Sequence, residues 1–204
     1  MNTPSKSRIA LTFDDGPAAH TSRLLDLFAH HGGKATFFLT GECIEGYQDI
    51  LRQMVAQGHQ IGIHGWNHQD LTTLTAEQAA EQIEQTRVAI RKATGVDTRL
   101  VRPPYGSLNP TLQAVGQQLD VVFINWSVIT MDWETLNAEA VCNEILSQTV
   151  DGDIVLCHDP HLSTVDAIEL ALPRLWERGY EPVTVSTLLS AHAPLQAGHL
   201  YNKA

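Results

Sequence analysis

The sequence predicts an α/β protein with a mainly parallel sheet, and two observations point to that class. Short apolar segments of strand character alternate with amphipathic segments of helical periodicity along the chain. Polar and charged residues gather just after several of the apolar segments, as they do at the carboxyl-terminal rim of a βα barrel. We expect strands at residues 8–13, 35–39, 60–63, 100–102, 121–125, 153–157 and 181–184, and helices at 21–31, 44–57, 76–94, 110–118, 138–148 and 165–178.

Local signals set the boundaries of these elements. The first strand is an apolar run over residues 9–13, and it breaks at Gly16-Pro17. The helix expected at 76–94 opens with Thr75 and has Gln78 three residues later, which is the pattern of a capping box. Glycines stand where helices should end: Gly32, Gly58, Gly95 and Gly179.

The chain is expected to form a single domain over residues 1–204. A length of 204 residues is enough to bury a full hydrophobic core. Hydrophobic residues make up 43% of the chain and charged residues 18%, which is ordinary for a globular protein. No linker, low-complexity tract or fixed-period repeat divides it.

The formal net charge of −10 excludes two classes of partner. Nucleic acid and anionic membrane surfaces both require basic patches on the protein. No apolar stretch is long enough for an integral membrane segment, and the first eight residues lack the apolar part of a signal peptide. Because the chain carries a negative net charge, we expect a neutral or cationic substrate. The chain as written is expected to be cytoplasmic, or exported if a leader was removed; the oligomeric state does not follow from the sequence.

Three cysteines have no paired spacing and fit a reducing compartment better than a disulfide framework. Cys157 stands beside His158 and could suggest a thiol nucleophile. Alternation along a strand, however, turns Cys157 away from whatever His158 faces. We expect Cys43, Cys142 and Cys157 to be small buried hydrophobes.

Asp14 and Asp15 end the first strand, directly before Gly16-Pro17. Adjacent carboxylates raise each other's pKa unless a cation offsets them, and a metal ion is a common offsetting cation. Successive strand residues point to opposite sides, so we expect the two carboxylates to have different roles. The alternative is a simple Asp-Gly turn that closes a hairpin.

His64 and His68 follow the strand at 60–63 and are separated by three residues. Two imidazoles at this spacing can share a metal, and a carboxylate then completes the set. Such pairs also arise by chance in surface loops. His59 is a competing ligand, but it precedes the same strand and should lie at the opposite end of the barrel.

Three further positions carry candidate functional groups. Arg102 ends a strand and is followed by a rigid Pro-Pro turn, which suits a guanidinium that holds a carboxylate, or a surface Arg. Asp132 lies in an apolar stretch and needs a partner, for which His158 is the obvious candidate; otherwise Asp132 starts a helix or turn. His158 ends a buried strand, which suits a general acid or a loop turn with no role.

These segments, taken in order, resemble the polysaccharide deacetylases, also called the NodB-homology group or carbohydrate esterase family 4. The likeness covers a core from about residue 8 to residue 189 through five motifs in the family's order. The matching segments are Thr12-Phe13-Asp14-Asp15-Gly16-Pro17, His64 with His68, Arg102-Pro103-Pro104-Tyr105-Gly106, Asp132-Trp133 in part, and Leu156-Cys157-His158. The resemblance implies a distorted (β/α)7 barrel with mainly parallel strands.

The resemblance also implies a role for each matched residue. The implied metal ligands are Asp15, His64 and His68, with Zn²⁺ as the default ion and Co²⁺, Ni²⁺ or Mn²⁺ as alternatives. Asp14 resembles the general base held by Arg102, and His158 resembles the general acid tuned by Asp132. The implied substrate pocket comprises Tyr105, whose backbone N–H stabilises the oxyanion, together with Trp133 and Leu156, which line the acetyl-methyl pocket.

Two positions depart from the family pattern. Gly65 stands where the family usually has Ser or Thr, so a hydroxyl that braces the metal loop is missing. Ile129 stands where the family usually has Asp, so a hydrogen-bond partner near Arg102 is lost or replaced.

The expected activity is hydrolysis of N-acetyl groups from glycans that contain N-acetylglucosamine, of chitin-oligosaccharide or peptidoglycan type, with release of acetate. Removal of O-acetyl groups from xylan, or hydrolysis of an amide in a small molecule, is the alternative within catalysis. A catalytically silent glycan-binding barrel is the alternative outside it.

Overall fold

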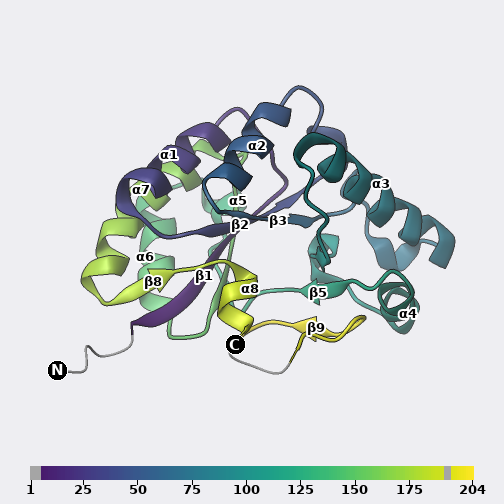
Figure 1. Cartoon of the computed structure of the whole chain (residues 1–204). Coiled ribbons are helices and arrows are strands. Elements are labelled where there is room, and N and C mark those ends of the chain that lie inside the picture. The colour runs from purple at the N-terminus through teal and green to yellow at the C-terminus, as the bar shows by residue number, and fades with distance from the viewer. Residues whose placement is uncertain (1–5, 191–193) are drawn as a thin grey trace.

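The chain forms a curled sheet of parallel strands with helices along its outer face (Figure 1). The structure is a computed structural model that describes residues 6–190 and 194–204. The strands follow the order β6-β7-β1-β2-β3-β4-β5-β9, and β8 pairs with the first part of β1. Their bounds are β1 Ser7–Asp14, β2 Ala35–Leu39, β3 Gln60–Ile63, β4 Leu100–Val101, β5 Val122–Ile124, β6 Val128–Ile129, β7 Ile154–His158, β8 Tyr180–Pro182 and β9 Leu200–Tyr201. The expectation of a distorted, mainly parallel barrel is confirmed.

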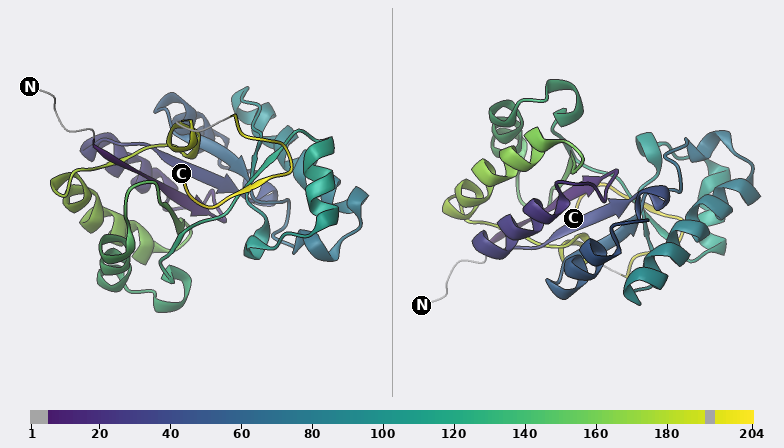
Figure 2. Two further views of the ribbon diagram at one scale, coloured as in Figure 1. Left: turned by 90° about the horizontal axis from the view of Figure 1, so that it is seen from below. Right: turned by 90° about the horizontal axis from the view of Figure 1, so that it is seen from above.

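The helices form a layer whose order follows that of the strands. Neighbouring helices pack in the sequence α6, α7, α1, α2, α3, α4 around the outside of the sheet (Figures 1 and 2). Their bounds are α1 Thr21–His31, α2 Gln48–Ala56, α3 Ala76–Thr94, α4 Pro110–Gln118, α5 Asp132–Thr135, α6 Ala138–Gln148, α7 Leu162–Glu177 and α8 Val185–Leu189, with short 3-10 turns at Gly41–Cys43, Leu71–Thr73 and Pro104–Gly106. This layering leaves the carboxyl ends of the strands together at one rim.

Several element boundaries differ from those expected. The helix expected at 44–57 begins only at Gln48, because Gly46 has a φ of 87°, a left-handed conformation that a helix cannot contain. The helix α7 begins at Leu162, three residues before the expected start, and contains Pro173. Two-residue strands such as β6 and β9 are too short to show a period of two. The capping box at Thr75 and Gln78 is present as expected.

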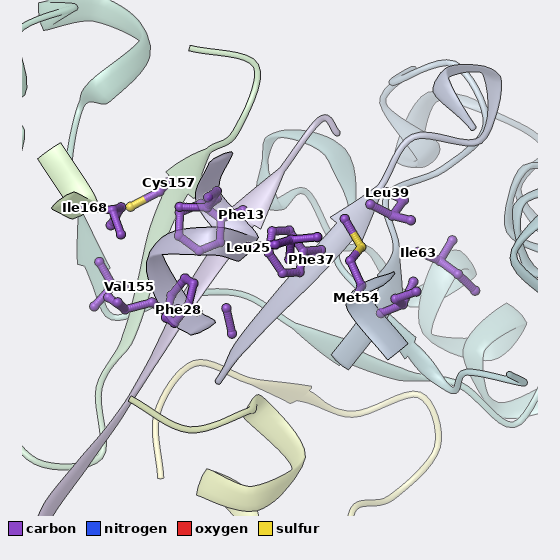
Figure 3. Packing of buried hydrophobic residues seen from close by; sticks show 14 of the residues in the cluster. Phe13, Leu25, Phe28, Phe37, Leu39, Met54, Ile63, Val155, Cys157 and Ile168 are labelled. Atoms are coloured by element: carbon purple, nitrogen blue, oxygen red, sulfur yellow. The ribbon is translucent and has the colours of Figure 1, made fainter. Parts of the chain in front are cut away.

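Alternate residues of β1 divide the core into two parts. Ile9, Leu11 and Phe13 face the helices and belong to the larger cluster, which lies between the sheet and the helix layer. Figure 3 shows part of this cluster, with Phe13 and Phe37 from neighbouring strands close together. Their ring centroids are 5.3 Å apart in a stacked arrangement. This outer cluster fixes the positions of the strands.

The opposite face of β1 changes from apolar to charged toward the rim. Ala10 packs in a second, smaller cluster that includes residues of α8. Thr12, two residues further, is buried and donates its hydroxyl hydrogen to the carbonyl oxygen of Val155 at 2.6 Å. Asp14, the last residue of β1, is only 2% exposed. The inner face therefore leads from a hydrophobic base to a buried carboxylate at the rim.

The cysteines are free thiols, and two of the three are buried as expected. Cys157 packs in the outer core, beside Ile168 in Figure 3, and burial raises the pKa of its thiol. Cys43 is only partly buried, so the expectation was wrong there, because it lies in the 3-10 turn at the rim instead of in a strand or helix. Among the described residues, no helix combines the length and the apolar character needed to cross a bilayer.

Candidate functional site

A cavity of about 430 Å³ opens at the carboxyl-terminal rim of the strands. Its lining residues are Asp14, Asp15, His64, His68, Tyr105, Trp126, Ile129, Trp133, Leu156 and His158. Eight of the ten candidate site residues named from the sequence therefore meet around one hollow. The other two, Arg102 and Asp132, are completely buried and contact lining residues from behind.

Asp15, His64 and His68 form a cluster with one donor atom from each residue. The donor atoms all lie within 4.8 Å of one another. The Asp15 Oδ1 is 3.4 Å from the Nε2 of His64 and 3.4 Å from the Nε2 of His68. It is buried and has no hydrogen-bond partner within residues 6–190 and 194–204. Two imidazole nitrogens and an unpartnered carboxylate oxygen in this arrangement fit a divalent transition-metal ion.

The orientation of His64 is fixed by its other ring nitrogen. The Nδ1 lies 2.7 Å from the carbonyl oxygen of Arg102, which can only accept a hydrogen bond. In the neutral ring, the proton therefore sits on Nδ1, and the lone pair of Nε2 faces the cluster. Such a bond to the distal nitrogen is the usual support for a histidine ligand.

The charges of the cluster shift its pKa values in opposite directions. Burial raises the pKa of Asp15, but the close approach of the His64 ring and the charges of His64 and His68 outweigh it and bring the pKa to about 2. Burial lowers the pKa of His64, but the charges of Asp14 and Asp15 raise it above the ordinary value. Burial lowers the pKa of His68. The ionised form of Asp15 is therefore the resting form, as a metal ligand requires.

Asp14 is held by Arg102 from inside the barrel. The Asp14 Oδ1 accepts a hydrogen bond from Nη1 of Arg102 at 2.7 Å. The other carboxylate oxygen, Oδ2, is 3.7 Å from His64 Nε2. One oxygen of Asp14 is thus engaged, and the other is directed toward the cluster.

The guanidinium of Arg102 makes four hydrogen bonds without a carboxylate at position 129. It donates to Thr12 Oγ1 at 2.7 Å, and to the backbone carbonyl oxygens of Ile124 at 3.2 Å and Asn125 at 2.9 Å. Its central carbon lies 4.2 Å from the centroid of the Phe38 ring. Ile129 instead lies in the cavity wall and is 42% exposed. Hydroxyl and carbonyl oxygens therefore replace the partner that the family usually supplies.

Asp132 and His158 form a second carboxylate–imidazole pair. Asp132 Oδ1 lies 2.8 Å from Nδ1 of His158, and its Oδ2 accepts from the backbone N–H of His158 and the hydroxyl of Thr164, each at 2.7 Å. Burial lowers the pKa of His158, but the hydrogen bond and charge of Asp132 outweigh it and raise the pKa. Asp132 also begins the short helix α5, so both expectations for this residue apply.

The remaining three predicted residues form the outer walls. Tyr105 is 68% exposed, and its ring meets that of His68 edge-on with 4.8 Å between centroids. Trp133 stands edge-on to His158 at 5.0 Å. Leu156 is two residues before His158 on β7 and completes the apolar side of the cavity.

Left-handed backbone conformations bring several of these side chains into place. Asp15 has a φ of 69°, His68 of 57° and Tyr105 of 62°. Such conformations are uncommon for residues with a side chain and are concentrated at functional sites. The expectation that Asp14 and Asp15 point to opposite sides was wrong, because β1 ends at Asp14 and the positive φ of Asp15 turns its carboxylate to the same cavity.

The loop that carries His64 and His68 is braced by α3, which the sequence did not indicate. The Oε1 of Gln82 accepts hydrogen bonds from the backbone N–H groups of Trp66 and Asn67 at 2.9 and 3.3 Å. The hydroxyl of Thr86 donates to the carbonyl oxygen of Gly65 at 2.8 Å. The brace missing at Gly65 is thus supplied by two side chains from a neighbouring helix.

The fold and the site together define a class: a parallel-stranded (β/α) barrel with an Asp-His-His cluster at its carboxyl-terminal rim. The sequence model described as polysaccharide deacetylase matches residues 1–124. The chain belongs to the polysaccharide deacetylase family.

Two curated relatives show how far the similarity extends. The chain is 37% identical over 198 residues to the peptidoglycan-N-acetylglucosamine deacetylase PgdA of Listeria monocytogenes, covering 97% of this chain and 41% of that protein. It is 39% identical over 188 residues to a chitin deacetylase of Pestalotiopsis sp, covering 88% of this chain and 63% of that protein. The chain thus spans about two fifths of the length of the first of these relatives.

Two solved structures are similar over nearly the whole chain. A structure described as T48 deacetylase with substrate superposes with a TM-score of 0.92 at 35% identity, covering 97% of each chain. A family 4 acetyl xylan esterase from Clostridium thermocellum in complex with a cobalt ion superposes with a TM-score of 0.90 at 32% identity, covering 97% of this chain and 98% of the other.

Proposed function

We propose that the chain is a metal-dependent deacetylase that removes N-acetyl groups from glycans containing N-acetylglucosamine and releases acetate. One observation carries the proposal. A single cavity is lined by a three-donor cluster, by a carboxylate anchored on a buried Arg, and by an imidazole anchored on a buried carboxylate. Hydrolysis of an amide requires an activated carbonyl, a base for water and an acid for the leaving nitrogen.

Asp15, His64 and His68 are the proposed metal ligands. Zn²⁺ is the first choice for two imidazoles and one carboxylate, with Co²⁺, Ni²⁺ and Mn²⁺ as alternatives. When bound, such an ion polarises an acyl carbonyl and makes water more acidic.

Asp14 is the proposed general base. Arg102 fixes Asp14 Oδ1, which leaves Oδ2 as the oxygen that can take a proton in the cavity. Because Arg102 is itself held by two backbone carbonyl oxygens and a hydroxyl, the position of the base is set by the barrel interior. Precise positioning of this kind is what makes a proton-transfer group effective.

His158 is the proposed general acid, and Asp132 is the residue that tunes it. As the oxygen of water bonds to the acyl carbon and the C–N bond breaks, the nitrogen takes the proton of His158 and leaves as an amine. The raised pKa of His158 keeps that proton available near neutral pH. The backbone N–H of Tyr105 is the proposed donor to the oxyanion, and Trp133 and Leu156 are the proposed walls for the acetyl methyl group.

The substrate class is proposed from the relatives. Peptidoglycan N-acetylglucosamine and chitin are the substrates named for two proteins that resemble this chain over most of its length. Both are neutral at the reacting sugar, which suits an acidic protein. The acetyl xylan esterase among the structural neighbours makes O-acetyl removal the second candidate.

Acetate release from a panel of substrates tests the proposal. Chitin oligosaccharides, peptidoglycan fragments and acetylated xylan would each be incubated with the metal-loaded protein, with and without chelator. We expect chelator-sensitive acetate release from the N-acetylated glycans. Binding of a glycan without release of acetate would instead identify a silent glycan-binding barrel.

The variant His158→Ala separates amide from ester chemistry. An amine leaves poorly unless it is protonated, whereas an alcohol depends less on an acid. We expect His158→Ala to reduce acetate release from chitin oligosaccharides more than from acetylated xylan. Equal losses on both substrates would contradict the assignment of His158 as the acid for an amide.

A further inference from the structure

Asp159 is a buried carboxylate that the proposed chemistry does not use. It directly follows His158, the last residue of β7, and it is completely buried. Its Oδ2 accepts a hydrogen bond from the hydroxyl of Thr21. Its Oδ1 is also buried and has no hydrogen-bond partner in the described part of the chain. Burial, partly opposed by the bond from Thr21, raises the pKa of Asp159 to about 7.

The Asp159 carboxylate packs directly against the backbone of Gly16. A Cβ atom added at Gly16 would lie 2.2 Å from Oδ1, 2.5 Å from Oδ2 and 2.7 Å from the Cγ of Asp159. Gly16 does not have a positive φ, so its backbone conformation does not itself require glycine. The carboxylate of Asp159 is therefore what excludes a side chain at position 16.

Gly16 belongs to the segment that carries Asp14 and Asp15, and this segment is held on two sides. Toward β2, the carbonyl oxygen of Gly16 accepts a hydrogen bond from the backbone N–H of Thr40 at 3.0 Å. Toward β7, it meets Asp159. The positive φ of Asp15 means that the regular pairing of β1 ends before Gly16, so these two contacts determine where the segment lies.

Thr21 adds a second connection between Asp159 and the same loop. The hydroxyl oxygen of Thr21 accepts a hydrogen bond from the backbone N–H of Ala18 at 2.8 Å while its hydrogen is donated to Asp159. Thr21 is completely buried at the start of α1. Asp159 thus joins the loop after β1 at Gly16 by packing, and at Ala18 through Thr21.

We propose that Asp159 is a positioning residue that fixes the segment Asp14-Asp15-Gly16 relative to His158. It sets the distance between the base and metal ligand at the carboxyl end of β1 and the acid at the end of β7, and in this sense the proposal rests on the proposed function. What matters is the shape and hydrogen bonding of the side chain. Asparagine, which has the same shape and keeps an oxygen for Thr21, should therefore replace it.

The first test compares Asp159→Ala with Asp159→Asn in the full chain, with Co²⁺ as the metal probe. Loss of an outer partner of a metal site typically costs about 10- to 100-fold in metal affinity or activity. We expect Asp159→Ala to weaken Co²⁺ binding and to lower kcat on a chitin oligosaccharide by this order, to alter the visible spectrum of bound Co²⁺, and to leave KM almost unchanged. Asp159→Asn should stay close to the wild type in all four measurements.

Asp166→Asn is the matched control, because it removes another carboxylate of the same region. Asp166 lies on α7, where its exposed carboxylate pairs with Arg23 at 2.6 Å, and this pair takes no part in the contacts described above. It should leave Co²⁺ binding and kcat unchanged. Wild-type behaviour of Asp159→Ala, or losses in Asp159→Asn equal to those in Asp159→Ala, would overturn the proposal.

The second test changes Gly16, the other partner in the contact with Asp159. Gly16→Ala places a methyl group where the Asp159 carboxylate lies, so we expect it to reduce Co²⁺ affinity and kcat more than Asp159→Ala does. The double variant Gly16→Ala, Asp159→Ala removes the clash, and the new methyl group occupies part of the space left by the carboxylate. We expect the double variant to recover at least to the level of Asp159→Ala. Losses that multiply in the double variant would contradict the proposal.

Thermal unfolding of each metal-free variant shows which of them fold. If Asp159→Ala does not fold, Asp159→Asn and the double variant still decide the test. The Co²⁺ affinity and spectrum need no substrate. They therefore test the role of Asp159 even if the wild type releases no acetate, a result that would refute the proposed function alone.

Discussion

The two ends of strand β3 each carry a buried histidine, and the comparison shows what distinguishes a functional end from a structural one. His59 precedes the strand and is 7% exposed, and His64 follows it and is 2% exposed. The Nδ1 of His59 accepts a hydrogen bond from the backbone N–H of Ala35, and burial lowers the pKa of His59 to about 4. The charges of Asp14 and Asp15 raise the pKa of His64 despite burial.

The neighbours of the two rings explain the opposite shifts. The ring of His59 lies 5.3 Å from the ring of Phe28 and 5.6 Å from that of Phe37, in edge-on arrangements that belong to the apolar core. His64 lies between carboxylates. Burial alone therefore does not predict the charge of a histidine, whereas the groups at the carboxyl ends of neighbouring strands do.

Cavity volume does not distinguish the amino end of the strands from the carboxyl end either. A cavity of about 470 Å³ lies at the amino-terminal end, where His59, Gln60 and Thr98 contribute to its lining. The cavity at the carboxyl-terminal rim is slightly smaller, at about 430 Å³. Of these two cavities, the one at the rim contains the cluster of Asp15, His64 and His68, with the Asp14 carboxylate held by Arg102 and the His158 ring held by Asp132.

The largest expected effect comes from removing a proposed metal ligand, His64, at the carboxyl end of β3. His64→Ala should lose bound metal and lower kcat by more than the roughly 100-fold upper range seen for outer partners of metal sites. Metal analysis after dialysis, together with acetate release, measures both effects. If His64→Ala kept a stoichiometric amount of metal, His64 would not be a required ligand, and its proposed difference from the structural residue His59 would be wrong.

Asp14→Asn should produce the next largest effect and should separate the two carboxylates. Loss of a positioned proton-transfer group lowers turnover by about 10²- to 10⁴-fold. Because Asp15 and not Asp14 is the proposed metal ligand, Asp14→Asn should retain its metal, in contrast to Asp15→Asn. Steady-state kinetics and metal content of the two variants provide the comparison.

Asp132→Asn should change the pH dependence of the reaction. In the wild type, Asp132 raises the pKa of His158, with smaller contributions from Asp14 and Asp15. Removing the charge of Asp132 lowers that pKa, so the protonated acid is lost at a lower pH. The alkaline limb of the kcat profile should therefore move to lower pH. At a fixed pH on that limb, kcat should fall about tenfold for each unit by which the pKa of His158 is lowered. An unmoved alkaline limb would show that His158 is not the acid.

The smallest effect on activity is expected at the structural end. His59→Leu leaves the backbone N–H of Ala35 without its acceptor, which costs about 1–3 kcal/mol of stability. The kcat should stay at the wild-type level, as measured beside a urea unfolding curve.

The pH dependence of stability provides an internal check on His59. The unfolded chain protonates this ring below about pH 6.5, whereas the folded protein resists protonation down to about pH 4. The wild type should therefore lose stability as the pH falls through this window. His59→Leu should show a shallower loss in the same window.

The sequence predicted most of the site because the chemistry lies at strand ends. Asp14, His64, Arg102 and His158 each stand within one residue of the end of an apolar run, and parallel strands bring such ends to one rim. The order of helices and strands could also be predicted, because the longer segments show a clear hydrophobic periodicity. The short elements β6, β9 and α8 show no clear period in the sequence and were missed.

Contacts between elements distant in the chain could not be predicted. Nothing in the sequence relates Gln82 to the loop after β3, or Thr164 to Asp132, because these contacts exist only once helices pack on the sheet. The sequence also offered no indication of the positive φ of Asp15, since residues other than glycine rarely adopt such a conformation. The contact of Thr12 with Arg102 was also missed, although the position of Thr12 two residues before Asp14, on the same face of β1, was a signal that could have found it.

The interior guanidinium has a consequence for the motions of the barrel. Arg102 joins Thr12 and Asp14 on β1 to the carbonyl oxygens of Ile124 and Asn125 at the end of β5, and three other strands lie between these two in the sheet. Neither strand end can open without breaking this cross-link. Amide protons near the ends of β1 and β5 should therefore exchange with solvent as one cooperative unit, and fraying of either strand alone should not expose the carboxylate of Asp14.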